Sequence, residues 1–244
     1  MTPLPDARVE VLHDPEVLAH RVADWLLAAA RAEGSIFKIA LSGGSTPQLL
    51  YECLATAPYR DRFPWSRVHW FWGDERFVPH SDPLSNYRMV QEALFAHAPV
   101  PIANIHPIIT EGLSPDAAAL TYELMLKTFY GAERLDAARP LFDVTLLGLG
   151  EDGHTASLFP GTAVLSERDR WVSAVIGAKA EARITLTYPA IESSRRVAFL
   201  VTGSGKHEIF TALREGDSAL PAACVHPIGE LTWFLDRAAA GTVT

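Results

Sequence analysis

Three glycine-containing segments carry the residue types best suited to chemistry, and the first is Ser42-Gly-Gly-Ser-Thr-Pro47. Glycines let the backbone approach a ligand closely, and the free N–H groups at the start of a helix attract anions. The segment predicts a phosphate-binding loop, although an ordinary strand-to-helix turn has a similar composition and the ending of a Walker A loop is missing. The candidate anion-binding residues are Ser42, Gly43, Gly44, Ser45 and Thr46.

The second segment, Gly73-Asp-Glu-Arg76, follows an aromatic run at 68–72. Arg76 could bind a phosphate through two parallel hydrogen bonds, and Asp74 could accept a proton or a hydroxyl hydrogen bond. A salt-bridged surface turn would contain the same residue types. The sequence therefore leaves both interpretations open and predicts a charged turn here.

The third segment, Gly148-Leu-Gly-Glu-Asp-Gly-His154, matches the spacing GxGxxG of dinucleotide-binding proteins. That fingerprint also requires an acidic residue about 20 positions later at the end of a second strand, whereas Glu167 and Asp169 lie in a polar stretch. Carboxylates inside the loop would also repel a pyrophosphate. A dinucleotide site is therefore rejected, and Asp152 with His154 remains as a candidate general acid–base pair. A histidine on the surface is the alternative.

The elements that must position these segments alternate between apolar runs and helical patterns. Runs typical of strands occupy 9–12, 36–41, 68–72, 142–147, 197–201 and 232–235. Helical patterns occupy 15 to about 34, 48–54, 86–95, 206–213 and a segment from 115 onward. Asp14-Pro15 and Ser114-Pro115 are typical helix starts. This alternation predicts one α/β domain over 1–244, with a mostly parallel sheet, helices on both faces and a long loop at 98–107.

The composition narrows the class of protein. The 244 residues are 48% hydrophobic and 20% charged, which is typical of a globular domain. The net charge of −8 disfavours nucleic acid and anionic lipid as partners. The two cysteines, Cys53 and Cys224, form no CxxC motif, and the histidines lack metal-ligand spacing. From this spacing we expect no metal site. The sequence shows neither a signal sequence nor an apolar run of about 18 residues, so we expect a cytoplasmic protein.

Taken together, the segments resemble the 6-phosphogluconolactonase family. The resemblance is carried, in order, by 41–47, 72–79, Ser85-Asn-Tyr87, 147–160, Arg183-Ile-Thr-Leu-Thr187 and Val201-Thr-Gly-Ser-Gly-Lys206. It implies a Rossmann-like α/β fold and hydrolysis of 6-phospho-D-glucono-1,5-lactone to 6-phosphogluconate, the second step of the pentose phosphate pathway. It also implies that a phosphosugar lactone is the partner and that no cofactor is used. Whether the chain is a monomer or a dimer stays open.

The resemblance also assigns roles to particular residues. His154 matches the catalytic histidine of the family, and Asp152 lies beside it. The implied substrate contacts are Ser42, Gly43, Gly44, Ser45, Thr46, Asp74, Arg76, Asn86, Lys179, Arg183 and Lys206. One departure lies at 178–182, where this chain reads Ala-Lys-Ala-Glu-Ala and relatives usually carry prolines after the lysine.

Two other classes of protein share features with this sequence. Glucosamine-6-phosphate isomerase (deaminase) resembles it through the phosphate loop and the Gly-x-Asp-Gly-His core, but its sequence places a glutamate five residues after the histidine. Here that position is Phe159, which cannot accept a proton, so ring opening would lack its partner. The second of these classes is a non-enzymatic, sugar-phosphate-binding regulatory domain. Regulators of this kind carry a DNA-binding helix-turn-helix, for which the chain shows no basic segment.

Overall fold

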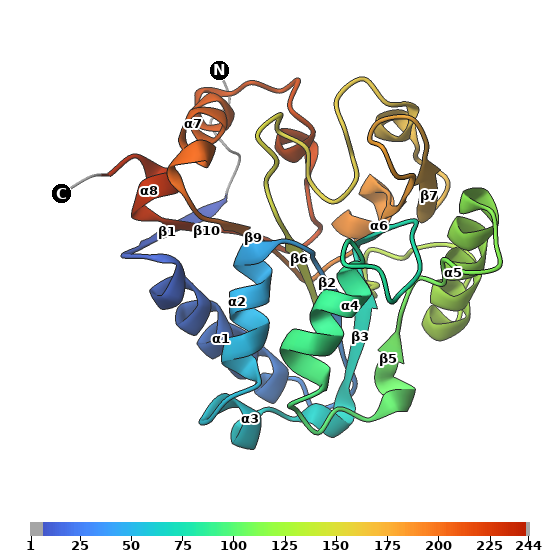
Figure 1. Ribbon diagram of the computed structural model, residues 1–244, viewed down its shortest axis with the longest axis horizontal. Coiled ribbons are helices and arrows are strands. Elements are labelled where there is room, and N and C mark those ends of the chain that lie inside the picture. Colours follow the sequence, from blue (N-terminus) through green and yellow to red (C-terminus); the bar gives the residue numbers. More distant parts are fainter. Residues whose placement is uncertain (1–6, 243–244) are drawn as a thin grey trace.

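The computed structural model describes residues 7–242 and contains a seven-stranded sheet in the order β1-β10-β9-β6-β2-β3-β5 (Figure 1). Every neighbouring pair in this sheet is parallel, so the predicted α/β architecture is confirmed. Its strands are β1 Arg8–Leu12, β2 Phe37–Leu41, β3 Val68–Trp72, β5 Ile105–His106, β6 Val144–Leu147, β9 Arg196–Val201 and β10 Glu230–Asp236. Since parallel strands end at one edge, loops that follow β2, β3 and β6 meet there.

Helices flank the sheet. They are α1 Pro15–Ala32, α2 Ser45–Leu54, α3 Tyr59–Arg62, α4 Asn86–Val90, α5 Pro115–Tyr130, α6 Tyr188–Glu192, α7 His207–Glu215 and α8 Arg237–Ala240. The predicted helix starts are confirmed, because the Asp14 carboxylate accepts the N–H of Val17 and the Ser114 hydroxyl accepts that of Ala117. Figure 1 shows α2 and α4 in front of the central strands and α5 at the side of the molecule opposite α7 and α8.

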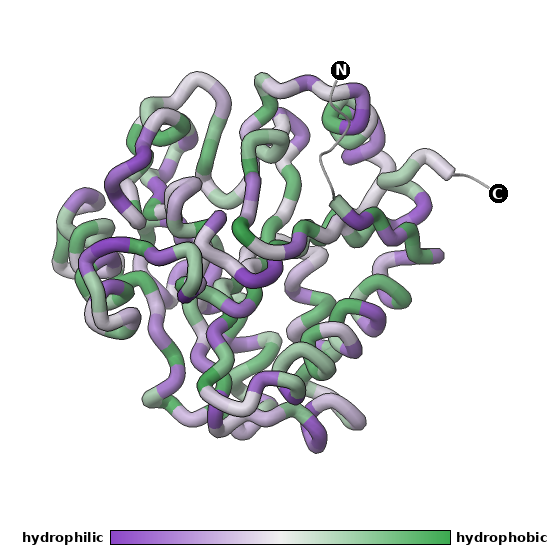
Figure 2. Tube along the Cα trace, turned by 180° about the vertical axis from the view of Figure 1, so that it is seen from behind, coloured by the Kyte–Doolittle hydropathy of each residue, from purple (hydrophilic) through white to green (hydrophobic). Residues whose placement is uncertain are grey.

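The core lies between the sheet and these helices. The fully buried side chains Trp70, Trp72 and Trp233 are among its largest members, and the rings of Trp233 and Phe199 stack 3.8 Å apart. The outer helices alternate between hydrophilic and hydrophobic stretches along the trace, because only one side of each helix faces this core (Figure 2).

A second, antiparallel sheet contains β4 Asp74–Arg76, β8 Arg183–Leu186 and β7 Val172–Val175, in that order. The prediction of a charged turn at 73–76 is therefore wrong, because Asp74–Arg76 is a strand. It pairs with β8 so that Arg76 lies opposite Arg183 and Asp74 opposite Thr185. Three polar residues are too few to show the alternation of apolar and polar residues that is typical of a strand. Their strand partner, β8, lies more than 100 residues later in the chain.

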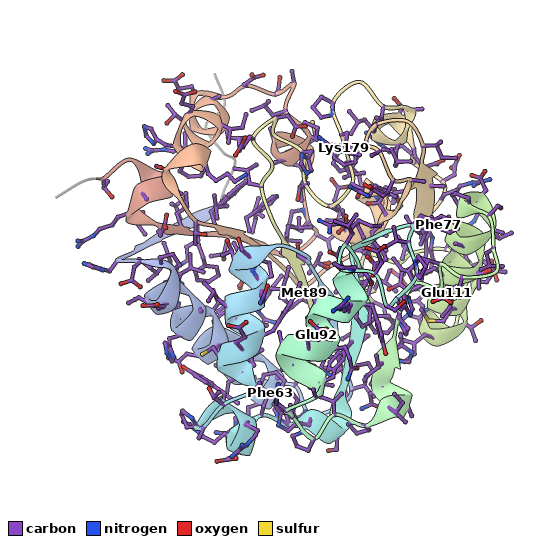
Figure 3. The ribbon with its side chains drawn as sticks, viewed as in Figure 1. Phe63, Phe77, Met89, Glu92, Glu111 and Lys179 are labelled. Carbon is purple, nitrogen blue, oxygen red and sulfur yellow. The ribbon has the colours of Figure 1, made fainter. Side chains whose placement is uncertain are left out.

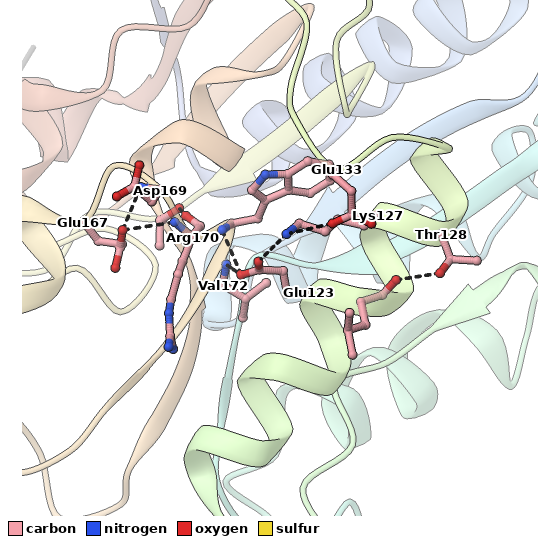
Figure 4. A network of polar contacts seen from close by, with 11 residues as sticks. Glu123, Lys127, Thr128, Glu133, Glu167, Asp169, Arg170 and Val172 are labelled. Carbon is pink, nitrogen blue, oxygen red and sulfur yellow. Dashed lines mark hydrogen bonds and ion pairs between the residues drawn. The ribbon is translucent and has the colours of Figure 1, made fainter.

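Helix α5 anchors this second sheet through a buried carboxylate (Figure 4). Glu123 accepts the backbone N–H groups of Trp171 (3.0 Å) and Val172 (3.2 Å), where β7 begins, and pairs with Lys127 one turn later. Hydrogen bonds to a charged carboxylate are stronger than those between neutral groups. The position of β7 is therefore fixed from the helix side.

The remaining differences from the predicted elements are local. Residues 98–107 are not only a loop, since Ile102–Asn104 form a 3₁₀-helix and β5 pairs with β3 at the sheet edge. The predicted helix at 86–95 consists of α4 followed by a π-helix at Gln91–Phe95. Helix α2 begins at Ser45, three residues earlier than predicted, because Gly44 adopts a φ of 104° and turns the chain into the helix.

A histidine pair lies at the edge formed by β3 and β5. His69 Nδ1 lies 2.9 Å from His106 Nε2, and the ring centroids of His69 and His106 lie 5.0 and 5.3 Å from that of Phe129. Burial, together with the neighbouring His69, lowers the pKa of His106 to about 4, and burial also lowers the pKa of His69. Both imidazoles are therefore more easily protonated in the unfolded chain.

We expect the free energy of unfolding to decrease as the pH is lowered from about 6.5 to about 4. In this range the unfolded chain binds a proton at residue 106 and the folded protein does not, so acid favours unfolding; above it the contribution of His106 is constant. Because the ring is only partly buried, the loss should be about 1–2 kcal/mol. Urea unfolding at several pH values should show a weaker pH dependence for His106→Gln, whereas exposed His97→Gln should match the wild type. Equal slopes in all three proteins would contradict the prediction.

Candidate active site

A cavity of about 230 Å³ lies at the carboxyl ends of the central strands and brings together all three predicted segments. It is lined by Ser42, Gly43, Gly44, Asp74, Arg76, Asn86, Gly148, Leu149, Gly150, His154, Thr155, Ala156 and Lys206. A larger cavity of about 720 Å³ lies between α2 and α4, near Met89 and Glu92 (Figure 3), and contains none of the predicted site residues. The smaller cavity is therefore the candidate active site.

The loop that follows β2 forms one wall of the cavity. A Cβ atom on Gly43 would lie 2.0 Å from Asn86 Oδ1, so only glycine lets the carboxamide of Asn86 pack directly against the loop. Ser45 and Thr46 belong to the first turn of α2 and do not line the cavity. Thr46 Oγ1 instead lies 2.6 Å from Thr202 Oγ1, which connects the loop to the segment after β9.

The second wall is built around Asp74, a residue that is only 8% exposed. Ser157 Oγ donates to Asp74 Oδ2 over 2.6 Å, and Asn86 Nδ2 donates to the Asp74 carbonyl over 2.9 Å. These contacts fix Asp74 at the cavity while leaving acceptor capacity on its carboxylate. Ser157 was not predicted from the sequence, although it lies in the Gly-His-Thr-Ala-Ser segment that carries the resemblance.

The neighbouring Glu75 is almost fully buried and holds the start of α4 against β4. Its carboxylate accepts the backbone N–H groups of Arg76, Asn86 and Tyr87 at 2.7–2.8 Å. Burial raises the pKa of Glu75, and these hydrogen bonds oppose the increase. Asn86 and Arg76 thus owe their positions to a residue that sequence reasoning did not single out.

His154 and Asp152 form the predicted pair. The ring nitrogen Nδ1 of His154 contacts Asp152 Oδ1, and the backbone N–H of His154 donates to the same oxygen over 3.1 Å. Burial favours the neutral acid, but the hydrogen bonds from His154 and the charge of Lys179 outweigh it and lower the pKa of Asp152. A Cβ atom on Gly150 would lie 2.0 Å from His154 Nδ1, so the pair requires glycine at that position. Asp152 is therefore a carboxylate that fixes the imidazole from its Nδ1 side.

The other side of the imidazole packs against an aromatic ring. The ring centroids of His154 and Phe159 lie 4.6 Å apart. Lys179 Nζ lies 5.1 Å from the Phe159 centroid and 3.8 Å from Asp152 Oδ2. Lys179 is thus placed beside the His154–Asp152 pair, outside the residues that line the cavity.

The other predicted cationic residues occupy different places. Arg76 and Lys206 line the cavity, and Arg76 Nη1 also donates to the carbonyl of Leu84 over 2.7 Å. Arg183 lies opposite Arg76 on β8, but its guanidinium contacts Glu181 at 3.4 Å and does not line the cavity. Two of the four cationic candidates, Arg76 and Lys206, are therefore in a position to meet an anion in the cavity.

Within residues 7–242, no group of three or more histidine, cysteine, aspartate or glutamate side chains could hold a metal ion. No helix in the same residues is long and apolar enough to cross a membrane.

Several known proteins resemble this chain in sequence and in fold. Residues 13–233 match the family described as glucosamine-6-phosphate isomerases/6-phosphogluconolactonase. The chain is 43% identical over 240 residues to the 6-phosphogluconolactonase of Synechocystis sp., covering 95% of this chain and 96% of that one. It is 40% identical over 207 residues to the 6-phosphogluconolactonase of Haemophilus influenzae, covering 82% and 85%. The crystal structure of the 6-phosphogluconolactonase from Thermotoga maritima superposes with a TM-score of 0.81 at 30% identity, covering 94% and 99%. The chain belongs to the family of glucosamine-6-phosphate isomerases and 6-phosphogluconolactonases.

Proposed function

We propose that this chain hydrolyses 6-phospho-D-glucono-1,5-lactone to 6-phosphogluconate, the second step of the oxidative pentose phosphate pathway. The observation that carries the proposal is the His154–Asp152 pair, whose imidazole lines the same cavity as the Ser42–Gly44 segment of the candidate anion-binding loop. Relatives at 40–43% identity bear the name of this activity. The cavity takes Asp74 and Arg76 from the second sheet, so both sheets belong to one functional domain.

In the proposed mechanism His154 is the general base. The Asp152 carboxylate accepts a hydrogen bond from the Nδ1–H group, which leaves Nε2 of the neutral imidazole free to take a proton from water. The water oxygen attacks C1 of the lactone, and the carbonyl oxygen becomes an oxyanion stabilised by backbone N–H groups of the cavity other than those that hold the phosphate. The C1–ring-oxygen bond then breaks, and His154 returns the proton to the ring oxygen. Asp152 remains ionised throughout because its pKa is lowered.

Substrate binding is assigned to the remaining polar residues. The 6-phosphate lies against the Gly43–Gly44 backbone and the start of α2, with Arg76 and Lys206 as its cationic partners. The Asp74 carboxylate accepts hydrogen bonds from sugar hydroxyls, and the Asn86 carboxamide both donates hydrogen bonds to them and accepts hydrogen bonds from them. Lys179 and Arg183 act from outside the cavity by adding positive charge.

The packing of Phe159 argues against isomerase chemistry. The residue lies against the His154 ring at the position where the isomerase sequence has its glutamate. A phenyl ring supplies neither a base nor a proton, so ring opening of an aminosugar lacks the group it needs. Lactone hydrolysis requires only water addition to a carbonyl that is already electrophilic.

The proposal is tested by assaying the purified protein with both substrates. We expect production of 6-phosphogluconate, measured by coupling to 6-phosphogluconate dehydrogenase, at a rate well above spontaneous hydrolysis in the same buffer. We expect no release of ammonia from glucosamine 6-phosphate. Ammonia release at a rate comparable to lactone hydrolysis would contradict the proposal.

A further inference from the structure

The hydroxyl of a buried tyrosine contacts the first residue of the candidate anion-binding loop, Ser42–Thr46. Tyr51, on α2, has no solvent exposure. Its Oη donates to the carbonyl oxygen of Ser42 over 2.8 Å and accepts the Ser42 N–H over 3.1 Å. A single side chain therefore satisfies both backbone groups of the first residue of the loop.

This contact begins where the strand pairing ends. Leu41 is the last residue of β2 and pairs with Trp72 of β3, so among the described residues Ser42 has no partner in the sheet. Unpaired backbone groups in the interior are costly, and Tyr51 supplies the hydrogen bonds that a neighbouring strand would otherwise provide. The conformation of the chain as it leaves β2 is therefore set by Tyr51.

The same contact determines the direction of the next N–H group. In a trans peptide the carbonyl and the following N–H point in opposite directions. Because the Ser42 carbonyl points at Tyr51, the Gly43 N–H points away from it. Gly43 lines the cavity, and within residues 7–242 its N–H donates no hydrogen bond to the protein. It is a preoriented donor beside the cavity.

We infer that Tyr51 is a positioning residue for substrate binding: its hydroxyl holds the Ser42–Gly43 peptide so that the Gly43 N–H binds the phosphate of the substrate. This inference rests on the proposed function, because it deepens the assignment of the phosphate to the Gly43–Gly44 backbone. Asn86, which Asp74 holds in place, packs against Gly43, so each residue of the Ser42–Gly43 peptide contacts a fixed side chain.

The experiment compares Tyr51→Phe with a matched variant, Tyr130→Phe. The Tyr130 hydroxyl likewise donates to a carbonyl (Arg139, 2.6 Å) and accepts an N–H (Asp136, 2.9 Å), but it lies away from the cavity. We expect Tyr51→Phe to raise the KM for the phosphorylated lactone about tenfold with kcat changed less than about twofold, the effect of one well-placed hydrogen bond. Its kcat/KM for unphosphorylated gluconolactone should stay at the wild-type level. Tyr130→Phe should lose a similar amount of thermal stability without changing either substrate's kinetics.

Two results would overturn the inference. One is an unchanged KM in folded Tyr51→Phe. The other is an equal loss on both lactones, which would indicate general damage or a role at the reacting carbonyl. Hydrolysis of the phosphorylated lactone by the wild-type protein tests the proposed function, whereas the comparison of Tyr51→Phe with the wild type tests the role of Tyr51. A failure of the function is therefore distinguished from a failure of the inference.

A measurement on the wild-type protein keeps the inference testable if Tyr51→Phe does not fold. Amide hydrogen exchange followed by NMR should show a slowly exchanging Ser42 N–H and a rapidly exchanging Gly43 N–H in the free protein. Added 6-phosphogluconate should slow exchange at Gly43, and added gluconate should not. A Gly43 amide that exchanges equally fast with and without 6-phosphogluconate would overturn the inference.

Discussion

Replacement of His154 by alanine is expected to lower kcat for 6-phosphogluconolactone by about 10²–10⁴-fold, the usual contribution of a general acid–base group. The variant removes the group that takes the proton from water, while the loop, Arg76 and Lys206 still line the cavity. Binding of 6-phosphogluconate, measured by calorimetry, should therefore be nearly unchanged. Spontaneous lactone hydrolysis must be subtracted, because it sets a lower limit on the measurable rate.

The chain offers a matched control for this variant. His13 Nδ1 lies 2.8 Å from Asp14 Oδ2, so a second histidine–aspartate pair exists on the surface, outside the cavity. His13→Ala should retain wild-type kcat and KM. A folded His154→Ala enzyme with turnover close to that of the wild type would remove His154 from the mechanism.

The second large effect concerns the phosphate of the substrate. The wild type should favour the phosphorylated lactone over gluconolactone by at least about 10²-fold in kcat/KM, because each charge-assisted hydrogen bond contributes about 1.5–3 kcal/mol. Arg76→Ala should reduce this preference by about tenfold or more while changing kcat/KM for gluconolactone much less. Steady-state kinetics with both lactones measure the ratio directly.

Arg88→Ala is the matched control for this experiment. Arg88 Nη1 donates to the carbonyl of Ser81 over 2.8 Å, much as Arg76 Nη1 donates to that of Leu84, but Arg88 lines the larger cavity between α2 and α4. Its removal should leave the preference intact. Similar activity of the wild type on both lactones would refute phosphate binding by the Ser42–Thr46 loop.

Much of the fold could be predicted because the central strands of the main sheet are apolar and each is followed by a recognisable break, whereas the two-residue edge strand β5 lies within the predicted loop at 98–107. The run at 68–72 coincides with β3, and the runs at 36–41 and 142–147 differ from β2 and β6 only in where they start. The candidate site could be predicted for a related reason. Its residues follow the ends of those strands within short contiguous segments, so local motifs already contain Gly43, Asp74 and His154.

What could not be predicted depends on pairing between distant segments. The second sheet joins Asp74–Arg76 to Arg183–Leu186, and neither segment alone alternates long enough to read as a strand. Nothing in the sequence distinguishes Ser157 or Tyr51 from other residues of their types. Their importance follows only from their contacts, which are with the Asp74 carboxylate for Ser157 and with the Ser42 backbone for Tyr51. Lys179 illustrates the opposite case: its position could be found by resemblance, but its contacts with Asp152 and Phe159 could not.

The strand order has a consequence for how the protein is synthesised. Within residues 7–242 β1 pairs with β10 alone, so that Arg8 lies opposite Thr232, and β10 in turn covers the edge of β9. On the ribosome β1 is made before the other strands of the sheet and must wait until residues 232–236 have been made before it can pair, whereas β2 and β3 can pair early. Pairings between such distant residues slow folding. Completion of this edge is thus the natural last step of folding, and nascent or truncated chains that lack β10 would leave β1 without a partner and β9 as an open edge prone to aggregation.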